Sequence, residues 1–101
     1  MILITKEIPD DFIDDIKTAV KILNDAGCKE VYIFGSLVRG DYHVFSDIDI
    51  AVRGLPKKEF FRIGGKLTMN LKHNFDIVEL DDENNNFSKF IKENEVFINV
   101  A

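Results

Sequence analysis

The stretch that decides the fold is Val31-Tyr32-Ile33-Phe34-Gly35-Ser36, followed after ten residues by Asp47-Ile48-Asp49-Ile50-Ala51-Val52. The first four residues are apolar and β-branched or aromatic, which is typical of a buried strand that runs directly into a glycine and a serine. In the second segment, apolar residues alternate with aspartates and an alanine, which is the two-residue period of a strand. Two strands are therefore expected in the middle of the chain.

Helices and further strands are predicted on either side of this centre. Apolar side chains recur at helical spacing over residues 11–26 and 57–71. Gly64-Gly65 should kink the second helix or pack closely against a strand, because each glycine costs about 1 kcal/mol relative to alanine in a helix. The remaining segments predict a strand over 75–80, a turn over 81–86, a short helix carrying Phe87, Phe90 and Ile91, and a last strand over 96–100. This alternation indicates a small α/β layer fold.

Composition limits the class of protein. The 101 residues are 46% apolar, which suits one domain over residues 1–101 with a real core. No apolar run approaches the roughly 20 residues of a membrane span, and the amino terminus lacks the pattern of a secretory signal. A single cysteine favours a reducing, cytoplasmic location. The net charge of −5 disfavours direct binding to nucleic acid, which depends on a basic surface.

Asp47 and Asp49 are the most informative pair of residues. Two positions apart in a strand, their side chains leave the same face with Cα atoms about 6.6 Å apart. Two like charges side by side repel, so a cation is expected between them. Mg²⁺ is the best candidate because it takes oxygen ligands from one or two carboxylates and from substrate phosphates. The alternative is an exposed strand face on which both aspartates are simply solvated.

A third carboxylate is predicted from the strand over residues 75–80. Asp76 and Glu79 are three positions apart and point to opposite faces, so only one can join Asp47 and Asp49. Asp76 shares its face with Val78 and Leu80, where a lone charge needs a partner or a metal. We therefore favour Asp76, and the alternative is again a surface aspartate.

A phosphate-binding loop is predicted where the first strand ends. Gly35 would let the backbone approach a phosphate closely, and Ser36 would supply a hydroxyl donor. If a helical turn begins near Ser36, its free N–H groups point at the anion. Arg39 could neutralise phosphate charge or pair with one of the carboxylates. A Gly-Ser pair alone is more often an ordinary turn, so the prediction depends on the combination with the three aspartates.

This combination resembles the nucleotidyltransferases of the DNA polymerase β superfamily, where Gly-Ser, ten residues and Asp-x-Asp are followed by an acidic residue on a later strand. Arg39-Gly40, Ser46 and the segment Phe75–Leu80 also match that pattern. Over nearly its whole length the chain is similar to the minimal nucleotidyltransferases, the antitoxin type typically encoded beside a small helical HEPN-type toxin. The resemblance implies the polymerase-β-like palm fold, an α+β arrangement in which helices flank a small mixed sheet.

The resemblance also implies roles for the residues singled out above. Asp47 and Asp49 would hold two Mg²⁺ ions against the triphosphate of ATP, and Asp76 would bind the catalytic metal and help to deprotonate the acceptor hydroxyl. Gly35 and Ser36 would hold the β- and γ-phosphates. Attack at the α-phosphorus would then place a nucleoside monophosphate on the acceptor and release pyrophosphate.

Three rival functions stay open at this point. The favoured hypothesis is transfer of AMP to a hydroxyl of a HEPN-type toxin, with this chain as the antitoxin. The first rival is transfer to a small molecule, although the superfamily members that do so carry an additional acceptor domain for which no residues are left. The second rival is an antitoxin that acts by binding alone, which would have no need of three carboxylates. The third is an α/β domain with an acidic strand and no such activity.

Overall fold

The computed structural model describes residues 8–81, 89 and 92–100. Its elements are, in chain order, α1 (Asp10–Asp25), β1 (Glu30–Phe34), α2 (Ser36–Arg39), β2 (Ile48–Arg53), the 3-10 helix η1 (Lys57–Glu59), α3 (Phe60–Asn70), β3 (Phe75–Glu79) and β4 (Ile98–Asn99). The strands form one sheet in the order β3-β2-β1-β4. β1 pairs antiparallel with β2 and β4, whereas β2 and β3 are parallel. The sheet is therefore mixed, as the resemblance implied.

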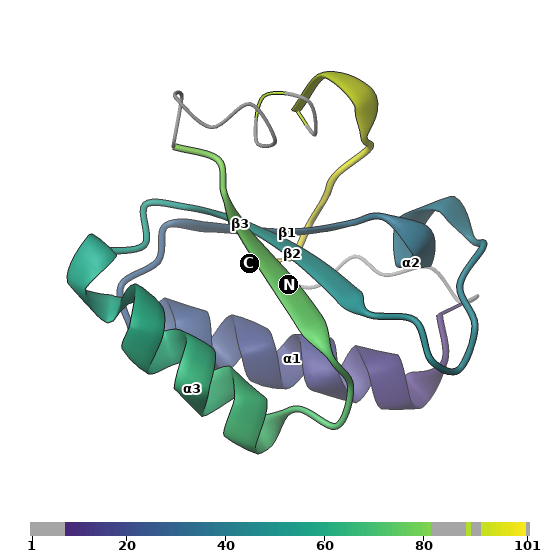
Figure 1. The fold of residues 1–101 in the computed structure, drawn as a ribbon, viewed down its shortest axis with the longest axis horizontal. Helices are drawn as coiled ribbons and strands as arrows, with labels where there is room; N and C mark the ends of the chain where they lie inside the picture. The colour runs from purple at the N-terminus through teal and green to yellow at the C-terminus, as the bar shows by residue number, and fades with distance from the viewer. Residues whose placement is uncertain (1–7, 82–88, 90–91, 101) are drawn as a thin grey trace.

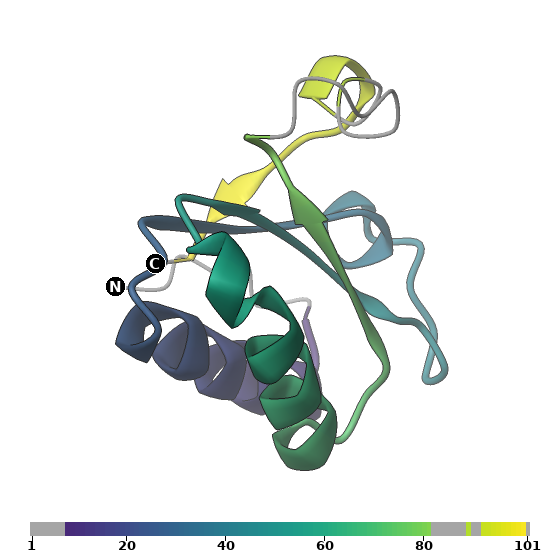
Figure 2. The ribbon, with the colours of Figure 1, turned by 60° about the vertical axis from the view of Figure 1, so that its left-hand side comes forward.

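The two long helices, α1 and α3, cover the same face of the sheet (Figures 1 and 2). Their apolar sides pack against alternate residues of the central strands, and Ile48, Ile50 and Val52 of β2 are completely buried in this layer. Burial of large aliphatic side chains contributes roughly 1.5–3 kcal/mol each, so this layer is the main source of stability. The other residues of β2 point to the opposite face of the sheet.

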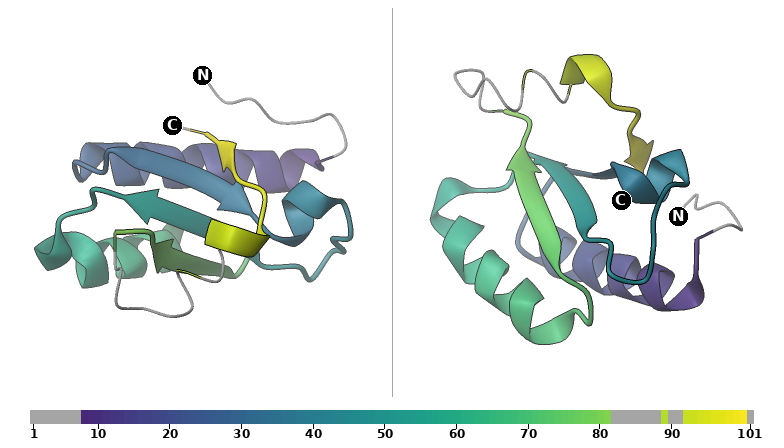
Figure 3. Two further views of the ribbon diagram at one scale, coloured as in Figure 1. Left: turned by 90° about the horizontal axis from the view of Figure 1, so that it is seen from above. Right: turned by 45° about the vertical axis from the view of Figure 1, so that its right-hand side comes forward.

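That opposite face carries a second, smaller apolar cluster formed by Phe34, Ala51, Val78 and Leu80. The C-terminal segment lies over this face, on the side away from α1 and α3 (Figure 3). Phe97 from this segment packs against Phe34, with ring centroids 5.3 Å apart. The C-terminal segment thus covers the part of this face that carries the cluster. The beginning of β2 and the beginning of β3 lie outside that part.

The loop between α3 and β3 is fixed to α1 by a buried carboxylate. Asp15 is only 3% exposed, and its Oδ2 accepts hydrogen bonds from the backbone N–H groups of Lys72 (2.9 Å) and His73 (2.8 Å). The same oxygen lies 2.7 Å from Nδ1 of His73, whose ring stacks on Phe12 with centroids 3.9 Å apart. Removing Asp15 would leave these donors unpaired, so this contact fixes where β3 begins.

Several predictions about the elements need adjustment. The glycines Gly64 and Gly65 neither interrupt α3 nor pack against a strand, because a Cβ atom at either position would have no heavy atom within 4 Å. The helix expected over 57–71 is divided into η1 and α3, and the last strand is limited to Ile98–Asn99. The short helix expected around Phe87, Phe90 and Ile91, and all of the turn over 81–86 except Asp81, lie outside the described residues.

No helix in the described part of the chain has the length and apolar character needed to span a bilayer.

Candidate active site

The pairing of three strands places the main predicted site residues in a row. Phe34 of β1 is paired with Asp49 of β2, and Asp49 is paired with Asp76 of β3. Gly35 follows Phe34 directly, so the row begins at the glycine loop and ends at the edge strand β3. Asp47 stands two residues before Asp49, immediately ahead of β2, on the same side of the backbone.

The face on which the carboxylates lie is divided between polar and apolar ends. Further along the two strands, the positions corresponding to Asp49 and Asp76 are occupied by Ala51 and Val78, which are buried in the second apolar cluster. Glu79 points to the opposite face of the sheet from Asp76 and is paired with Val52 at the far end of β3. The register therefore brings Asp76 beside Asp49, and leaves Glu79 away from the row.

Gly35 is in direct contact with the carboxylate of Asp49. The backbone at Gly35 has φ +78° and ψ −147°, a conformation that residues with a side chain rarely adopt. A Cβ atom there would lie 2.9 Å from Cγ of Asp49 and would overlap Oδ2. The sequence suggested that this glycine admits a phosphate. The structure adds that it admits the aspartate, whose carboxylate occupies the space a side chain would need.

The environment of Asp49 disfavours its ionised form. Partial burial, followed by the charges of Asp76 and Asp47, raises the pKa of Asp49 to about 6, while Arg39 acts in the opposite direction. Asp47 and Asp76 are exposed, whereas Asp49 is partly buried. A cation beside these carboxylates would relieve the repulsion between them.

The residues in the row fit a magnesium site completed by phosphates. No three acidic, histidine or cysteine side chains of the described residues are close enough together to make a ready-formed metal cage. Mg²⁺ seldom uses such a cage, because it is usually held by one or two carboxylates, several waters and the phosphates of a substrate. Asp49 and Asp76, which are neighbours in register, with Asp47 two residues before Asp49, could supply oxygen ligands of this kind.

Arg39 lies near the row but does not form an ion pair with it. α2 begins at Ser36, as expected, and ends at Arg39, whose Nη1 is 2.8 Å from a carboxylate oxygen of Glu95 and whose Nε is 3.4 Å from Asp41. The predicted pairing of Arg39 with one of the three aspartates is therefore not present in the structure. Exposed ion pairs contribute little, typically 0–1 kcal/mol, so Arg39 can exchange these partners for a phosphate at small cost.

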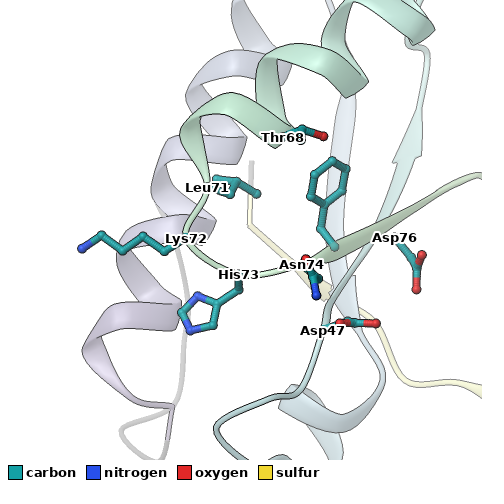
Figure 4. Close-up of a pocket in the computed structure, with 8 residues that line it drawn as sticks. Asp47, Thr68, Leu71, Lys72, His73, Asn74 and Asp76 are labelled. Carbon is teal, nitrogen blue, oxygen red and sulfur yellow. The ribbon is translucent and has the colours of Figure 1, made fainter.

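Two of the three carboxylates open onto a cavity beside β3, which is the outermost strand on this side of the sheet among the described residues. This cavity has a volume of about 410 Å³ and is lined by Asp47 and Asp76 together with Thr68 and residues 71–75. Figure 4 shows the carboxylates of Asp47 and Asp76 pointing to the same side, with Asn74 next to them. Asn74 and Glu95 were missed by the sequence analysis, because neither belongs to a motif and both reach the site through contacts distant in the chain.

Comparison with known proteins identifies the family. Residues 11–100 match the family model described as polymerase beta, nucleotidyltransferase. The chain belongs to this family. The membership confirms the resemblance to the polymerase β superfamily and the fold that it implied. No protein with a curated description matches the chain significantly.

Solved structures of similar fold include two toxin–antitoxin complexes. One, described as a toxin–antitoxin with AMP-PNP, is 27% identical, with a TM-score of 0.61 over 83% of this chain and 69% of that chain. Another, a double Asp-to-Glu mutant of the toxin–antitoxin pair MntA-HpeT, is 25% identical, with a TM-score of 0.60 over 82% of this chain and 70% of that one. A Sulfolobus solfataricus protein classed as a nucleotidyltransferase shares the fold at 22% identity and a TM-score of 0.52, covering 92% of this chain and 86% of its own.

The contact between Gly35 and Asp49 can be tested with two alanine variants. Gly35→Ala should lower the affinity for Mg²⁺ and AMP-PNP at least tenfold in calorimetry, because the new methyl group displaces the Asp49 carboxylate. Gly40→Ala is the matched control, since Gly40 also has a positive φ, +90°, but a Cβ atom there meets nothing within 4 Å. It should lose some stability and keep the affinity within about threefold of the wild type, a difference of less than about 1 kcal/mol. Equal affinities of the two variants would contradict the role of this contact.

The raised pKa of Asp49 predicts a pH-dependent gain in stability when its charge is removed. The pKa is about 6 in the folded chain against an ordinary value of 3.8, so the cost of ionisation to the fold is absent below pH 3.8, grows between pH 3.8 and 6, and is complete above pH 6. Asp49→Asn keeps the size of the side chain and should raise the free energy of unfolding by about 1–3 kcal/mol at pH 7.5. Urea unfolding without divalent ions should show almost no gain at pH 3.5. A gain independent of pH would refute the electrostatic explanation.

Proposed function

We propose that the chain is a Mg²⁺-dependent nucleotidyltransferase that transfers AMP from ATP to a hydroxyl group of a partner protein, and that the partner is a helical HEPN-type toxin. The observation that carries this proposal is the row of Gly35, Asp49 and Asp76 across three adjacent strands. This row places a loop that is suited to binding phosphates next to carboxylates that are suited to binding metal ions. Family membership supports the reaction type, and toxin–antitoxin complexes among the similar structures support the partner.

Each residue in the row has a distinct part in this reaction. Gly35 and Ser36 hold the β- and γ-phosphates through backbone N–H groups and the hydroxyl, and Arg39 neutralises part of their charge once it releases Glu95 and Asp41. Asp47, Asp49 and Asp76 would hold two Mg²⁺ ions. When bound, these ions polarise the phosphates and lower the pKa of the acceptor hydroxyl.

The group transfer itself breaks one bond and forms one. The acceptor oxygen attacks the α-phosphorus. The bond between this phosphorus and the oxygen that bridges it to the β-phosphorus breaks, and pyrophosphate leaves with the electron pair. Asp76 is exposed at the edge strand, where an incoming hydroxyl can reach it, and its carboxylate accepts the proton. The half-buried Asp49 stays in contact with Gly35 and keeps the phosphate side of the site in position.

The net charge favours a protein over a nucleic acid as acceptor. The chain carries −5 overall, and three of its carboxylates gather where the acceptor must approach. A polynucleotide would bring a row of phosphates against this surface, which repels it. A nucleotide placed on a toxin hydroxyl would add bulk and negative charge, which would block the approach of RNA to the toxin.

Isotope labelling distinguishes this reaction from its rivals. The chain and the HEPN-type toxin encoded in the same genome should be incubated with Mg²⁺ and ATP labelled at either the α- or the γ-phosphate. The proposal predicts that α-label reaches the toxin and that γ-label does not. Asp47→Asn combined with Asp49→Asn should transfer none. γ-Label on the toxin would identify a kinase instead.

A survival assay separates modification from binding. Cells that express the toxin should be protected by the wild-type chain and not by the double asparagine variant. If the variant protects as well as the wild type, with no mass added to the toxin, the chain neutralises its partner by binding alone.

A further inference from the structure

We infer that the segment of the partner that carries the acceptor hydroxyl enters through a groove at the free edge of β3, and that this groove ends at Val44 and Phe45. The inference rests on the proposed function, because it assigns a place to the acceptor of that reaction. We call this surface the edge groove and define it by Val44, Phe45, Ser46, Lys72, His73 and Asn74, next to the carboxylates of Asp47 and Asp76.

The order of the strands decides which side of the site is left for the acceptor. In an in-line displacement, the attacking and leaving oxygens lie on opposite sides of the phosphorus. The phosphate loop at Gly35 follows β1, Asp49 lies on β2 and Asp76 lies on β3, which has no strand on its far side among the described residues. If pyrophosphate leaves on the Gly35 side, the hydroxyl must arrive from the side of Asp76, where the cavity opens.

The cavity at Asp76 continues toward the loop that precedes β2. A second hollow of about 170 Å³ is lined by Val44, Phe45 and Ser46, and it shares Lys72, His73 and Asn74 with the cavity of about 410 Å³ beside Asp47 and Asp76. The shared residues place the two hollows next to each other. The edge groove therefore leads from the reacting carboxylates to the tip of a loop.

One wall of the edge groove is held rigidly. His73 is fixed from both sides, because its Nδ1 contacts the buried Asp15 and its Nε2 lies 3.2 Å from Asp11. The carbonyl of Asn74 accepts a hydrogen bond from the N–H of Ile48 at 2.9 Å, which ties this wall to the start of β2. The side chain of Asn74 makes none of the hydrogen bonds found within the described residues, so its amide is available to a ligand.

The other wall is an ordered loop that exposes two apolar side chains. Hydrogen bonds from the N–H of His43 to Oγ of Ser46 (2.8 Å), and from the N–H of Ser46 to the carbonyl of His43 (2.9 Å), close the loop. At its tip, Val44 is 74% and Phe45 86% exposed. Large apolar groups held in water by a closed turn, beside a hollow that reaches a reaction centre, are suited to contact another apolar surface.

The chemistry of the edge groove fits a polypeptide. Its walls offer apolar contact at the tip, an amide at Asn74 that can hydrogen-bond a peptide backbone, and the carboxylate of Asp76 for a hydroxyl. Lys72 is the only cation of the groove, and in Figure 4 its side chain points away from Asp47 and Asp76. A nucleic-acid acceptor would need several cations to neutralise its phosphates, so a hydroxyl-bearing segment of a protein with a neighbouring apolar side chain is the occupant that fits.

Kinetics with matched serine variants test this assignment. Phe45→Ser should raise the KM for the HEPN-type toxin at least tenfold, and leave the Kd for Mg²⁺ and AMP-PNP unchanged. Phe61→Ser is the control, because Phe61 is equally exposed (89%) but lies on α3, two turns before the Thr68 that lines the cavity. It should change neither constant. An unchanged KM for Phe45→Ser, or an equal loss of nucleotide affinity, would overturn the inference.

Thiol protection tests the edge groove even if no nucleotide is transferred. Asn74→Cys places a reactive thiol in the groove, and Phe61→Cys places one outside it, while the native Cys28 is buried. The toxin should slow maleimide labelling of the Asn74→Cys thiol at least tenfold and leave that of Phe61→Cys unchanged. Protection without AMP transfer would refute the proposed function and keep the groove as the docking site. Protection of Phe61→Cys alone, or of neither thiol, would overturn the groove.

Discussion

The contact between the Asp49 carboxylate and the backbone of Gly35 is the constraint on which the rest of the site depends. It exists only because β1 and β2 pair in a register that sets Phe34 opposite Asp49, and because position 35 has no side chain. The loop at Gly35 and the carboxylate of Asp49 are thereby fixed relative to each other before any ligand binds. A shift of one residue in the pairing register would point the side chain of Asp49 into the core that α1 and α3 cover, where an ionised carboxylate is very costly.

The two faces of the sheet have different roles in this arrangement. α1 and α3 bury the alternate residues of β2 and supply most of the stability, so the opposite face can carry repelling charges. Burial, and then the charges of Asp76 and Asp47, raise the pKa of Asp49, and such a penalty is expected of a site that is to bind cations. The contact of Asp15 with the loop before β3 fixes the position of Asp76 in turn.

Much of the fold and of the candidate site could be predicted from the sequence, because both depend on local patterns. The two-residue alternation around Asp49 correctly predicted a strand there and the face to which Asp49 points. The spacing of three positions correctly placed Asp76 and Glu79 on opposite faces of β3. The sequence could not indicate contacts between distant residues: Arg39 pairs with Glu95, 56 positions away, instead of with an aspartate of the row, and His73 contacts Asp15, 58 positions away. The kink or close packing expected at the glycines of α3 is absent, since a sequence cannot show that the space beside them is empty. The roles of the site residues stay predictions.

The central claim is that a metal ion and a nucleotide together complete a site built on a half-buried Asp49 whose pKa is raised. The most direct measurement is calorimetry of AMP-PNP binding at pH 6 and pH 8, with and without Mg²⁺, in buffers of different ionisation enthalpy. The account predicts binding only with Mg²⁺, accompanied at pH 6, near the pKa of Asp49, by more proton release than Mg²⁺ causes from free AMP-PNP, and by no such excess at pH 8. Equally tight binding without Mg²⁺, or the absence of that excess at pH 6, would contradict it.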